Sequence, residues 1–321
     1  MTPIARRGLW ALGAVGVGLL AAINIYLAAR SIFIVVGGSP AVDWDQIVEA
    51  GGRVHHGDLY AVNATYAFPY SPLLAYVAGP LSWLGTVGWR VLHVAAALAL
   101  PKWPMRLATL AAWPFWFDLE TGNVLVFVVL TAAWAIRGNR WATAGYFLLT
   151  LLVPRPLTIP VAVWLLWRRP EWRLRFAVMA VAALAGVVAS GWADEWLGFV
   201  TSIGGQFESP NNLGPTRLIG AAWLLIGIPL AGWLIWRGRL GLASVALSYP
   251  YLLPYYLLML ILELAPRSDL DQSTSARRDR CVPAAASTGN GRGAAAEEGV
   301  QRSRSSSAEP RCRHARRRGR G

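Results

Sequence analysis

Carboxylates and histidines, residue types that exchange protons or bind metals, crowd one short stretch, VDWDQIVEAGGRVHHGDLY (residues 42–60). Its acidic residues are Asp43, Asp45, Glu49 and Asp58, and its two histidines are His55 and His56. Side chains of these two kinds act as general acids and bases, and both ligate divalent metals. This stretch is therefore the first candidate for a reaction site.

Each of these residues also has a purely structural interpretation. In SPAVDWDQ, Asp43 stands three residues before Gln46, which is the capping-box spacing at the start of a helix. Asp45 and Glu49 also suit the positively charged end of such a helix. A metal site is disfavoured, because the two adjacent histidines lack the i, i+4 spacing that places two ligands on one helix face. We predict neither a metal nor a cofactor.

The composition of the whole chain is that of a membrane protein. Hydrophobic residues make up 55% of the 321 residues, whereas soluble domains are about 45–50% apolar. The run GLWALGAVGVGLLAAINIYLAA (residues 8–29) reaches the roughly 20 apolar residues that cross a hydrocarbon core of about 30 Å. No small-residue cleavage site closes this run convincingly, so we interpret it as a retained first span rather than a signal peptide.

After a polar, turn-rich stretch at residues 36–70, apolar segments follow one another to residue 264. They lie at residues 71–88, 90–100, 107–117, 123–136, 141–153, 157–167, 176–191, 218–236 and 240–264. Several are short and contain Pro, which a membrane tolerates where protein or a water-filled cavity covers the freed backbone groups. We predict an all-α fold, a polytopic membrane helical bundle of about 8–10 transmembrane or re-entrant helices formed by residues 1–265.

Basic residues in short loops indicate which loops face the cytoplasm. They cluster at the N-terminus and at residues 137–140, 168–175 and 237–239. The opposite, extracytoplasmic side then receives residues 36–70, with a short helix, and residues 118–123, 154–156 and 192–217. With these loops on opposite sides, residues 71–117 must cross the membrane an odd number of times. This requires that the Pro-flanked segment at residues 107–117 is not a full span. We therefore expect a multi-pass protein of the cell membrane, surrounded by membrane lipids.

Beyond residue 265 the composition changes abruptly to Arg, Ser, Ala, Gly and Pro. Residues 266–321 carry 13 Arg against 6 Asp or Glu, which accounts for +7 of the formal net charge of +13, so the charge balance predicts no nucleic-acid partner. This segment buries too little apolar surface to offset its ordering entropy, and we predict that it is disordered. Two origins stay open, a genuine solvated tail and the out-of-frame translation of a GC-rich gene.

Five motifs follow one another along the chain. They are DWDQIVEAGGRVHHGDLY (residues 43–60), FPYSPLLAYVAGPLSWLG (residues 68–85), TGNVLVF (residues 121–127), VPRPLTIPVAVWLLWRRPEWR (residues 153–173) and PNNLGPTRLIG (residues 210–220). In this order they resemble glycosyltransferase family 87, the polyprenyl-phosphate-mannose-dependent mannosyltransferases of the GT-C superfamily. The resemblance covers about residues 8–264. Ser71 stands where the family has a first Pro and Asn123 where it has Gln, and the last motif lacks the family's Ser.

The resemblance implies a GT-C-like fold, a reaction and roles for individual residues. A sugar, mannose in the family, passes from a polyprenyl-phosphate donor to a lipid or glycan acceptor outside the cytoplasm. By the family's pattern Asp43 is the candidate general base, with Asp45 in reserve. Arg155 and Arg217 are the candidates for binding the donor phosphate, because a guanidinium makes bidentate, charge-assisted hydrogen bonds to phosphate.

The remaining candidates are polar and aromatic residues expected to bind substrate. They are His55, His56, Tyr60, Tyr70, Glu120, Asn123 and Asn212. Helix capping explains Asn123 equally well, and the tyrosines suit an interfacial aromatic belt. Arg155 has the alternative role of a snorkelling arginine at the end of a span, and Arg217 that of an anchor at the start of one.

Two other functions stay open. A transporter or channel carries charges inside its spans, whereas the charges here lie in loops and at span ends. The exception is His93, which we interpret as a neutral, hydrogen-bonded packing residue. An inverted repeat of the kind found in many transporters is not evident. The second alternative is an inactive, truncated glycosyltransferase.

Overall fold

The computed structural model describes residues 3–60, 68–202, 212–248 and 251–265. Helices joined by turns make up this part of the chain, and no strand occurs in it. The all-α prediction is therefore confirmed for the described residues. The tail predicted to be disordered, residues 266–321, lies outside them.

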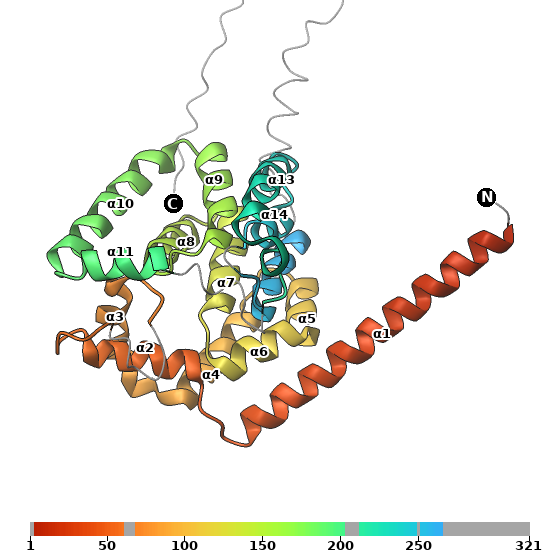
Figure 1. The fold of residues 1–321 in the computed structure, drawn as a ribbon, viewed down its shortest axis with the longest axis horizontal. Coiled ribbons are helices and arrows are strands. Elements are labelled where there is room, and N and C mark those ends of the chain that lie inside the picture. Colours follow the sequence, from red (N-terminus) through yellow and green to blue (C-terminus); the bar gives the residue numbers. More distant parts are fainter. Residues whose placement is uncertain (1–2, 61–67, 203–211, 249–250, 266–321) are drawn as a thin grey trace, which may run out of the picture. The chain divides into compact units, whose positions relative to one another are not determined.

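Figure 1 shows the helices in chain order. The α-helices are α1 (Pro3–Val36), α2 (Val42–Arg53), α3 (Pro72–Ala78), α4 (Gly85–Leu98), α5 (Trp103–Ala111), α6 (Trp113–Thr121), α7 (Leu125–Ile136), α8 (Arg140–Leu152), α9 (Ile159–Arg168), α10 (Glu171–Ala189), α11 (Ala193–Ser202), α12 (Thr216–Ile219), α13 (Leu224–Trp236) and α14 (Leu240–Ala246). Four 3-10 helices, η1 (Gly79–Leu84), η2 (Pro156–Thr158), η4 (Gly220–Trp223) and η5 (Pro254–Leu264), join or extend them. Helix α2 packs against α3 and η1 and also contacts α4 and α6.

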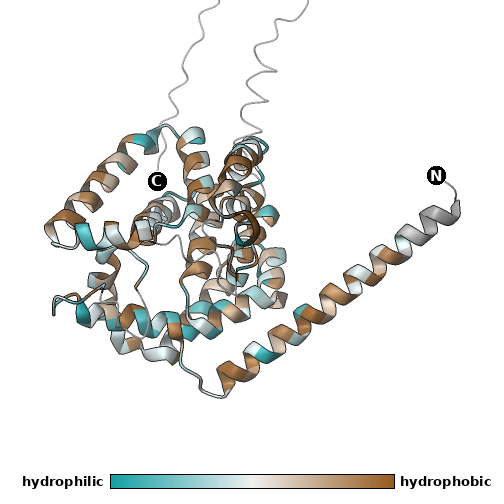
Figure 2. Ribbon diagram, viewed as in Figure 1, coloured by the Kyte–Doolittle hydropathy of each residue, from teal (hydrophilic) through white to brown (hydrophobic). Residues whose placement is uncertain are grey.

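Among the described residues, three helical stretches are long and apolar enough to cross a membrane, namely Leu12–Val36, Glu171–Ala189 and Thr216–Trp236. Only 11% to 17% of their most apolar windows is buried inside the protein, so most of their apolar surface is left for lipid. Figure 2 shows hydrophobic residues along most of α1. Membrane association is supported by these three helices, while the count of about 8–10 spans or re-entrant helices stays a prediction.

Several predicted segments are broken into helices too short to cross a membrane. The segment at residues 107–117 is divided at Ala112 between α5 and α6, each nine residues long and each with Pro near its start. Nine residues at 1.5 Å each extend about 14 Å, roughly half of a hydrocarbon core. This interruption fits the expectation that the segment is not a full span, which stays a prediction, and the segment at residues 240–264 is divided similarly into α14 and η5.

A polar residue in the middle of α1 hydrogen-bonds the backbone at the interruption between α5 and α6. Asn24 donates from Nδ2 to the Ala111 carbonyl at 2.8 Å, and its Oδ1 accepts the Trp113 N–H at 2.8 Å. These bonds satisfy backbone groups that the interruption between α5 and α6 would leave free. They also hold α6, and the turn that follows it, against α1.

Helix α2 begins differently from the predicted capping box. Its N-cap is Ala41, which has no side-chain capping bond, and the helix starts at Val42. Asp43 therefore lies inside the first turn, where its side chain is free to point to another part of the chain. The interpretation of Asp43 as an N-cap is wrong, and the reason is that the helix begins two residues earlier than the motif suggests.

Candidate functional site

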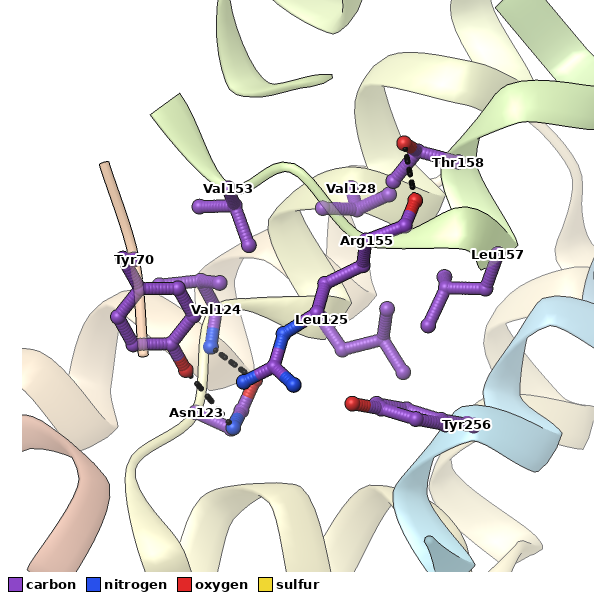
Figure 3. Close-up of a pocket in the computed structure, with 10 residues that line it drawn as sticks. All are labelled: Tyr70, Asn123, Val124, Leu125, Val128, Val153, Arg155, Leu157, Thr158 and Tyr256. Carbon is purple, nitrogen blue, oxygen red and sulfur yellow. Dashed lines mark hydrogen bonds between the residues drawn. The ribbon is translucent and has the colours of Figure 1, made fainter. Parts of the chain in front are cut away.

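The Asp43 side chain meets the turn between α6 and α7. Asn123 donates from Nδ2 to Asp43 Oδ2 at 2.8 Å, and the same nitrogen lies 3.4 Å from the Tyr70 hydroxyl. Asn123 Oδ1 accepts the Val124 N–H at 2.8 Å, and this bond fixes the amide with its nitrogen toward the carboxylate. Three segments predicted separately from the sequence thus meet at one point, of which Figure 3 shows the Asn123 and Tyr70 part.

A glycine in the left-handed conformation allows this close approach. Gly122 has φ +73°, and a Cβ added to it would lie 2.8 Å from the Cβ atoms of Ala41 and Trp44. Helix α2 therefore lies directly on the turn, and only glycine fits there. Trp44 also stacks on Trp89 of α4 at 4.1 Å between ring centroids, and Trp89 Nε1 donates to the Gly122 carbonyl at 2.7 Å.

Arg155 enters the same region from the turn between α8 and η2. Its Cζ lies 5.1 Å from the centroid of the Tyr70 ring, and its Nη1 donates to the Tyr251 hydroxyl at 2.7 Å. Figure 3 shows the guanidinium reaching between Tyr70 and Tyr256 toward Asn123. Within the described part of the chain, no carboxylate lies within ion-pair distance of it. A half-buried cation that lies among phenols and has no salt bridge in this part of the chain is suited to an anionic ligand.

The ten residues labelled in Figure 3 line a cavity of about 10 Å³, which is room for about one water molecule. Two apolar grooves lie outside it. One, of about 420 Å³, runs along α13, and Pro156, the residue after Arg155, is among the residues that line it. The other, of about 580 Å³, is lined by residues of α1, α4 and α6.

Burial raises the pKa of the Asp43 carboxyl above its usual value of 3.8. The hydrogen bonds from Asn123 and Thr121 and the charge of Arg155 oppose this effect but do not cancel it. Burial likewise raises the pKa of the Tyr70 hydroxyl, so Tyr70 stays protonated and can act as a donor. The site therefore combines a carboxylate more basic than usual, two neutral donors and a permanent cation.

Two of the predicted acidic residues lie away from this cavity. Asp45, two residues after Asp43 in α2, hydrogen-bonds the Thr86 side chain and lies close enough to Arg90 for the two charges to interact. Glu120 forms an ion pair with Arg30 of α1 at 3.7 Å. Both carboxylates therefore have structural partners, and the geometry favours Asp43 as the reactive acid.

The histidines of the same stretch are exposed. His55 and His56 follow α2, and His55 packs edge-on against the exposed ring of Tyr76 at 5.5 Å. Tyr60 is closer to the site, because its hydroxyl donates to the Tyr70 carbonyl at 2.9 Å. Tyr60 therefore supports the segment that carries Tyr70, and neither histidine lines the cavity of Figure 3.

The last motif contributes structure rather than a side chain to the cavity. Asn212 is buried, its Oδ1 accepts the N–H groups of Gly214 and Leu252 at 2.9 and 3.0 Å, and its Nδ2 donates to Thr216. Asn212 thereby holds the segment that contains Tyr251. Arg217 is exposed, which is the position expected for an anchor at the start of a span.

The sequence analysis missed two tyrosines that face Arg155. Tyr251 and Tyr256 stand on either side of Pro254, in the segment YLLPYYLL. Three aromatic hydroxyls around a proline, within a segment otherwise rich in leucine, are a signal that could have drawn attention to it. In the described part of the chain, no group of three His, Cys, Asp or Glu side chains is arranged to hold a metal ion.

No protein-family model, no curated protein and no solved structure matches the chain. The assignment to glycosyltransferase family 87 therefore depends on the quoted motifs and stays a prediction.

Proposed function

We propose that the protein is an integral-membrane glycosyltransferase that moves a sugar from a polyprenyl-phosphate donor to a lipid or glycan acceptor. One observation carries the proposal. The sequence analysis assigns Asp43 as the general base and Arg155 as the phosphate ligand. In the structure Asp43 accepts a hydrogen bond from Asn123, Arg155 lies over the ring of Tyr70, and Asn123 and Tyr70 contact each other. A transfer reaction needs both tasks performed at one reacting carbon.

The transfer requires one proton acceptor. The acceptor hydroxyl attacks the anomeric carbon of the donor, a new carbon–oxygen bond forms, and the hydroxyl proton passes to the Asp43 carboxylate. A positioned base of this kind contributes about 10²–10⁴-fold in rate. The raised pKa of Asp43 makes it a stronger base than an exposed aspartate. The Asn123 amide fixes the orientation of the carboxylate through its bond to Oδ2.

The leaving group requires a cation. As the bond between the anomeric carbon and the phosphate oxygen breaks, its electron pair stays on the phosphate, and negative charge builds up on that oxygen. Arg155 supplies a guanidinium in a largely apolar setting, where charge-assisted hydrogen bonds to phosphate are strong. The Tyr251 hydroxyl accepts a hydrogen bond from Arg155, and the Tyr70 ring lies beside the guanidinium. Both hydroxyls can donate to the same phosphate oxygens.

A lipid carrier suits the surroundings of Arg155. The groove along α13 is lined by apolar residues, among them Pro156, Ile159 and Ile228, and Pro156 follows Arg155 in the chain. A sugar needs far more space than the cavity of about 10 Å³, so the site has to widen when the donor binds. Movement of this kind is common in enzymes that exclude water from the reaction.

We propose an extracytoplasmic site in a multi-pass protein. Helix α10 begins at the basic turn assigned to the cytoplasm, and its Gly186 lies against Leu73 of α3, beside α2. Glu171 and Gly186 are 15 positions apart in the chain, which corresponds to about 22 Å along a helix at 1.5 Å per residue. A helix of this length between the basic turn and α3 supports the assignment of the basic turn and the candidate site to opposite sides of the membrane under the positive-inside rule.

The test is to incubate membranes that contain the protein with a set of labelled polyprenyl-phosphate sugars, mannose first, and to look for labelled products. We expect transfer by the parent and none by Asp43→Asn at equal expression. Uptake of sugar into proteoliposomes without any new glycosidic bond would instead identify a transporter. Absence of transfer with every donor and acceptor, from a correctly folded protein, would contradict the proposal.

A further inference from the structure

Arginine and tryptophan occur together at the three basic turns of the chain. These turns lie at residues 137–140, 168–175 and 237–239, and they hold eight arginines and one glutamate, Glu171. The second turn appears in Figure 2 as hydrophilic residues where α9 meets α10. The proposed function uses these charges only to orient the protein in the membrane. What a face with this much positive charge binds is a separate question.

Five of these arginines are exposed and lie over tryptophan rings. The distance from the guanidinium carbon Cζ to the ring centroid is between 5.1 and 5.9 Å in the pairs Arg137–Trp134, Arg140–Trp141, Arg168–Trp167, Arg175–Trp172 and Arg237–Trp236. A cation at this distance is attracted by the face of the indole. The attraction takes up none of the N–H donors of the guanidinium, whose planar fork matches the oxygens of a phosphate. Each pair is therefore a positioned cation that suits a phosphate group.

The first two turns lie side by side. Arg169, in the second turn, is buried, and its Nη1 donates to the Thr143 hydroxyl of α8 at 3.2 Å. Its Nη2 lies 3.2 Å from the position of a Cβ added to Gly138, in the first turn. Arg169 therefore joins the two turns and serves packing rather than the surface.

The third turn lies on the same side of the helices. Trp223, just before α13, donates to the last carbonyl of α14 at 3.0 Å, and the next residue, Leu247, lines one groove together with Pro156, just before α9. Helices α9 and α13 therefore begin near each other. Because the two helices also pack together, they end on the same side, at Arg168 and Trp236. We call the five pairs of these three turns the Arg–Trp face.

The Arg–Trp face adjoins two of the three membrane-length stretches. Glu171–Ala189 begins at it and Thr216–Trp236 ends at it, and both leave most of their apolar surface for lipid. Three of the indoles are exposed, Trp141 by 75%, Trp167 by 47% and Trp236 by 63%. Indoles favour the headgroup level of a bilayer, where one end of the ring is in apolar surroundings and the other in polar ones. The surface of the membrane therefore suits this face better than a soluble acidic partner does.

We propose that the Arg–Trp face binds the phosphate groups of anionic phospholipids and gives the protein a preference for an anionic leaflet. A zwitterionic phospholipid also carries a phosphate, but its own ammonium group balances the charge. An anionic phospholipid keeps a net negative charge, which attracts basic segments at the membrane surface. The indoles hold the guanidinium groups at the depth of the phosphates. This inference depends neither on sugar transfer nor on the identity of the donor.

The test measures lipid selectivity of the full chain in nanodiscs that contain equal amounts of phosphatidylglycerol and phosphatidylcholine. Photoactivatable analogues of the two lipids are crosslinked to the protein in turn, and mass spectrometry identifies the labelled peptides. We expect phosphatidylglycerol to label residues 134–141, 167–175 and 233–239 about threefold or more above phosphatidylcholine, because each basic residue near the surface favours the anionic lipid. Equal labelling of these segments by the two lipids would overturn the proposal.

Variants separate the paired guanidinium from charge alone. Arg137→Gln, Arg168→Gln and Arg237→Gln combined should bring labelling by the two lipids close to equality. The corresponding three lysine substitutions keep the charge but lose the planar fork, and they should lose at least half of the preference. A full preference with lysine would overturn the Arg–Trp pairs as the binding units. Arg217→Gln removes an exposed arginine outside the face and should keep the parent preference.

A single substitution decides the matter if the triple variant does not fold. Arg137→Gln should lose the preference at residues 134–141 and keep it at the other two segments, because each pair binds its own phosphate. An undiminished preference at residues 134–141 would refute the proposal. Binding of a labelled acidic peptide through the same arginines, without any lipid preference, would identify a soluble partner and contradict it as well. The Arg-rich tail is present in every variant, so that differences between variants come from the turns.

Discussion

The Asn123 amide nitrogen lies 2.8 Å from the Asp43 carboxylate although the two residues are 80 positions apart in the chain. This bond joins the first polar stretch of the sequence to a turn between two short helices. It orients the carboxylate and partly offsets the effect of burial on its pKa. Under the proposed function, Asn123 therefore tunes the basicity of Asp43 and can also contact the sugar.

The pH dependence of transfer should report Asp43. The carboxylate must be ionised to accept a proton, so kcat/KM should fall as the pH drops through a pKa above the usual 3.8. In Asn123→Ala a hydrogen bond that lowers this pKa is lost, and the acidic limb should move to higher pH. The profile of kcat/KM against pH for both proteins tests this. Asn139→Ala is the control, because it removes only the α8 cap formed by Asn139 Oδ1. Its acidic limb should lie at the same pH as that of the parent.

The two arginines predicted to bind phosphate should behave differently. Arg155→Gln removes charge-assisted hydrogen bonds worth about 1.5–3 kcal/mol, so kcat/KM for the donor should fall roughly 10- to 150-fold. Arg217 is exposed and does not line the cavity. We therefore expect Arg217→Gln to change kcat/KM for the donor less than about twofold. Steady-state kinetics with varied donor distinguish the two. Similar losses from both substitutions would contradict the assignment of the phosphate to Arg155.

Gly122→Ala should damage both stability and activity. The positive φ costs a residue with a Cβ roughly 1–2 kcal/mol, and the new Cβ would also lie 2.8 Å from Ala41 and Trp44, which forces α2 off the turn. Gly57→Ala is the matched control, because Gly57 has φ +83° but open space around its Cβ position. Thermal unfolding in detergent should show a small decrease for Gly57→Ala and a larger one for Gly122→Ala. Only Gly122→Ala should also lose transfer.

Asp43→Asn should abolish transfer without weakening the fold. A carboxyl whose pKa is raised in the folded state binds a proton more tightly there than in the unfolded chain, so its ionised form at neutral pH opposes folding. The neutral amide removes this opposition. We expect an unfolding temperature equal to or above that of the parent, as is common for residues kept for function. A clear decrease would indicate a structural role for the Asp43 carboxylate.

The sequence was sufficient for the choice of loops but not for the geometry within them. The stretches at residues 36–70, 118–123 and 154–156, which loop charge and turn residues assign to one side of the membrane, contain Asp43, Asn123 and Arg155, and the structure brings these three residues together. The side of the membrane stays a prediction. Which acid of α2 faces the turn depends on where the helix begins. The capping-box motif placed that start two residues late.

Other contacts could not be read from the sequence, because long-range packing decides them. Glu120 has the same chemistry as Asp43 but lies against Arg30 of α1. Asn212 looked like a substrate ligand, yet its amide is fully used in holding Gly214, Thr216 and Leu252. Tyr251 reaches Arg155 across 96 positions, and no local pattern predicts such a contact.

The most direct test of the account is the single-turnover rate of sugar transfer from a polyprenyl-phosphate donor by Asp43→Asn and Asp45→Asn in matched membranes. The two substitutions remove the same charge from the same helix, but only the first removes the carboxylate that binds Asn123. The account predicts a loss of about 10²-fold or more for Asp43→Asn and a rate close to the parent's for Asp45→Asn. Equal rates for the two variants, or a loss confined to Asp45→Asn, would contradict it.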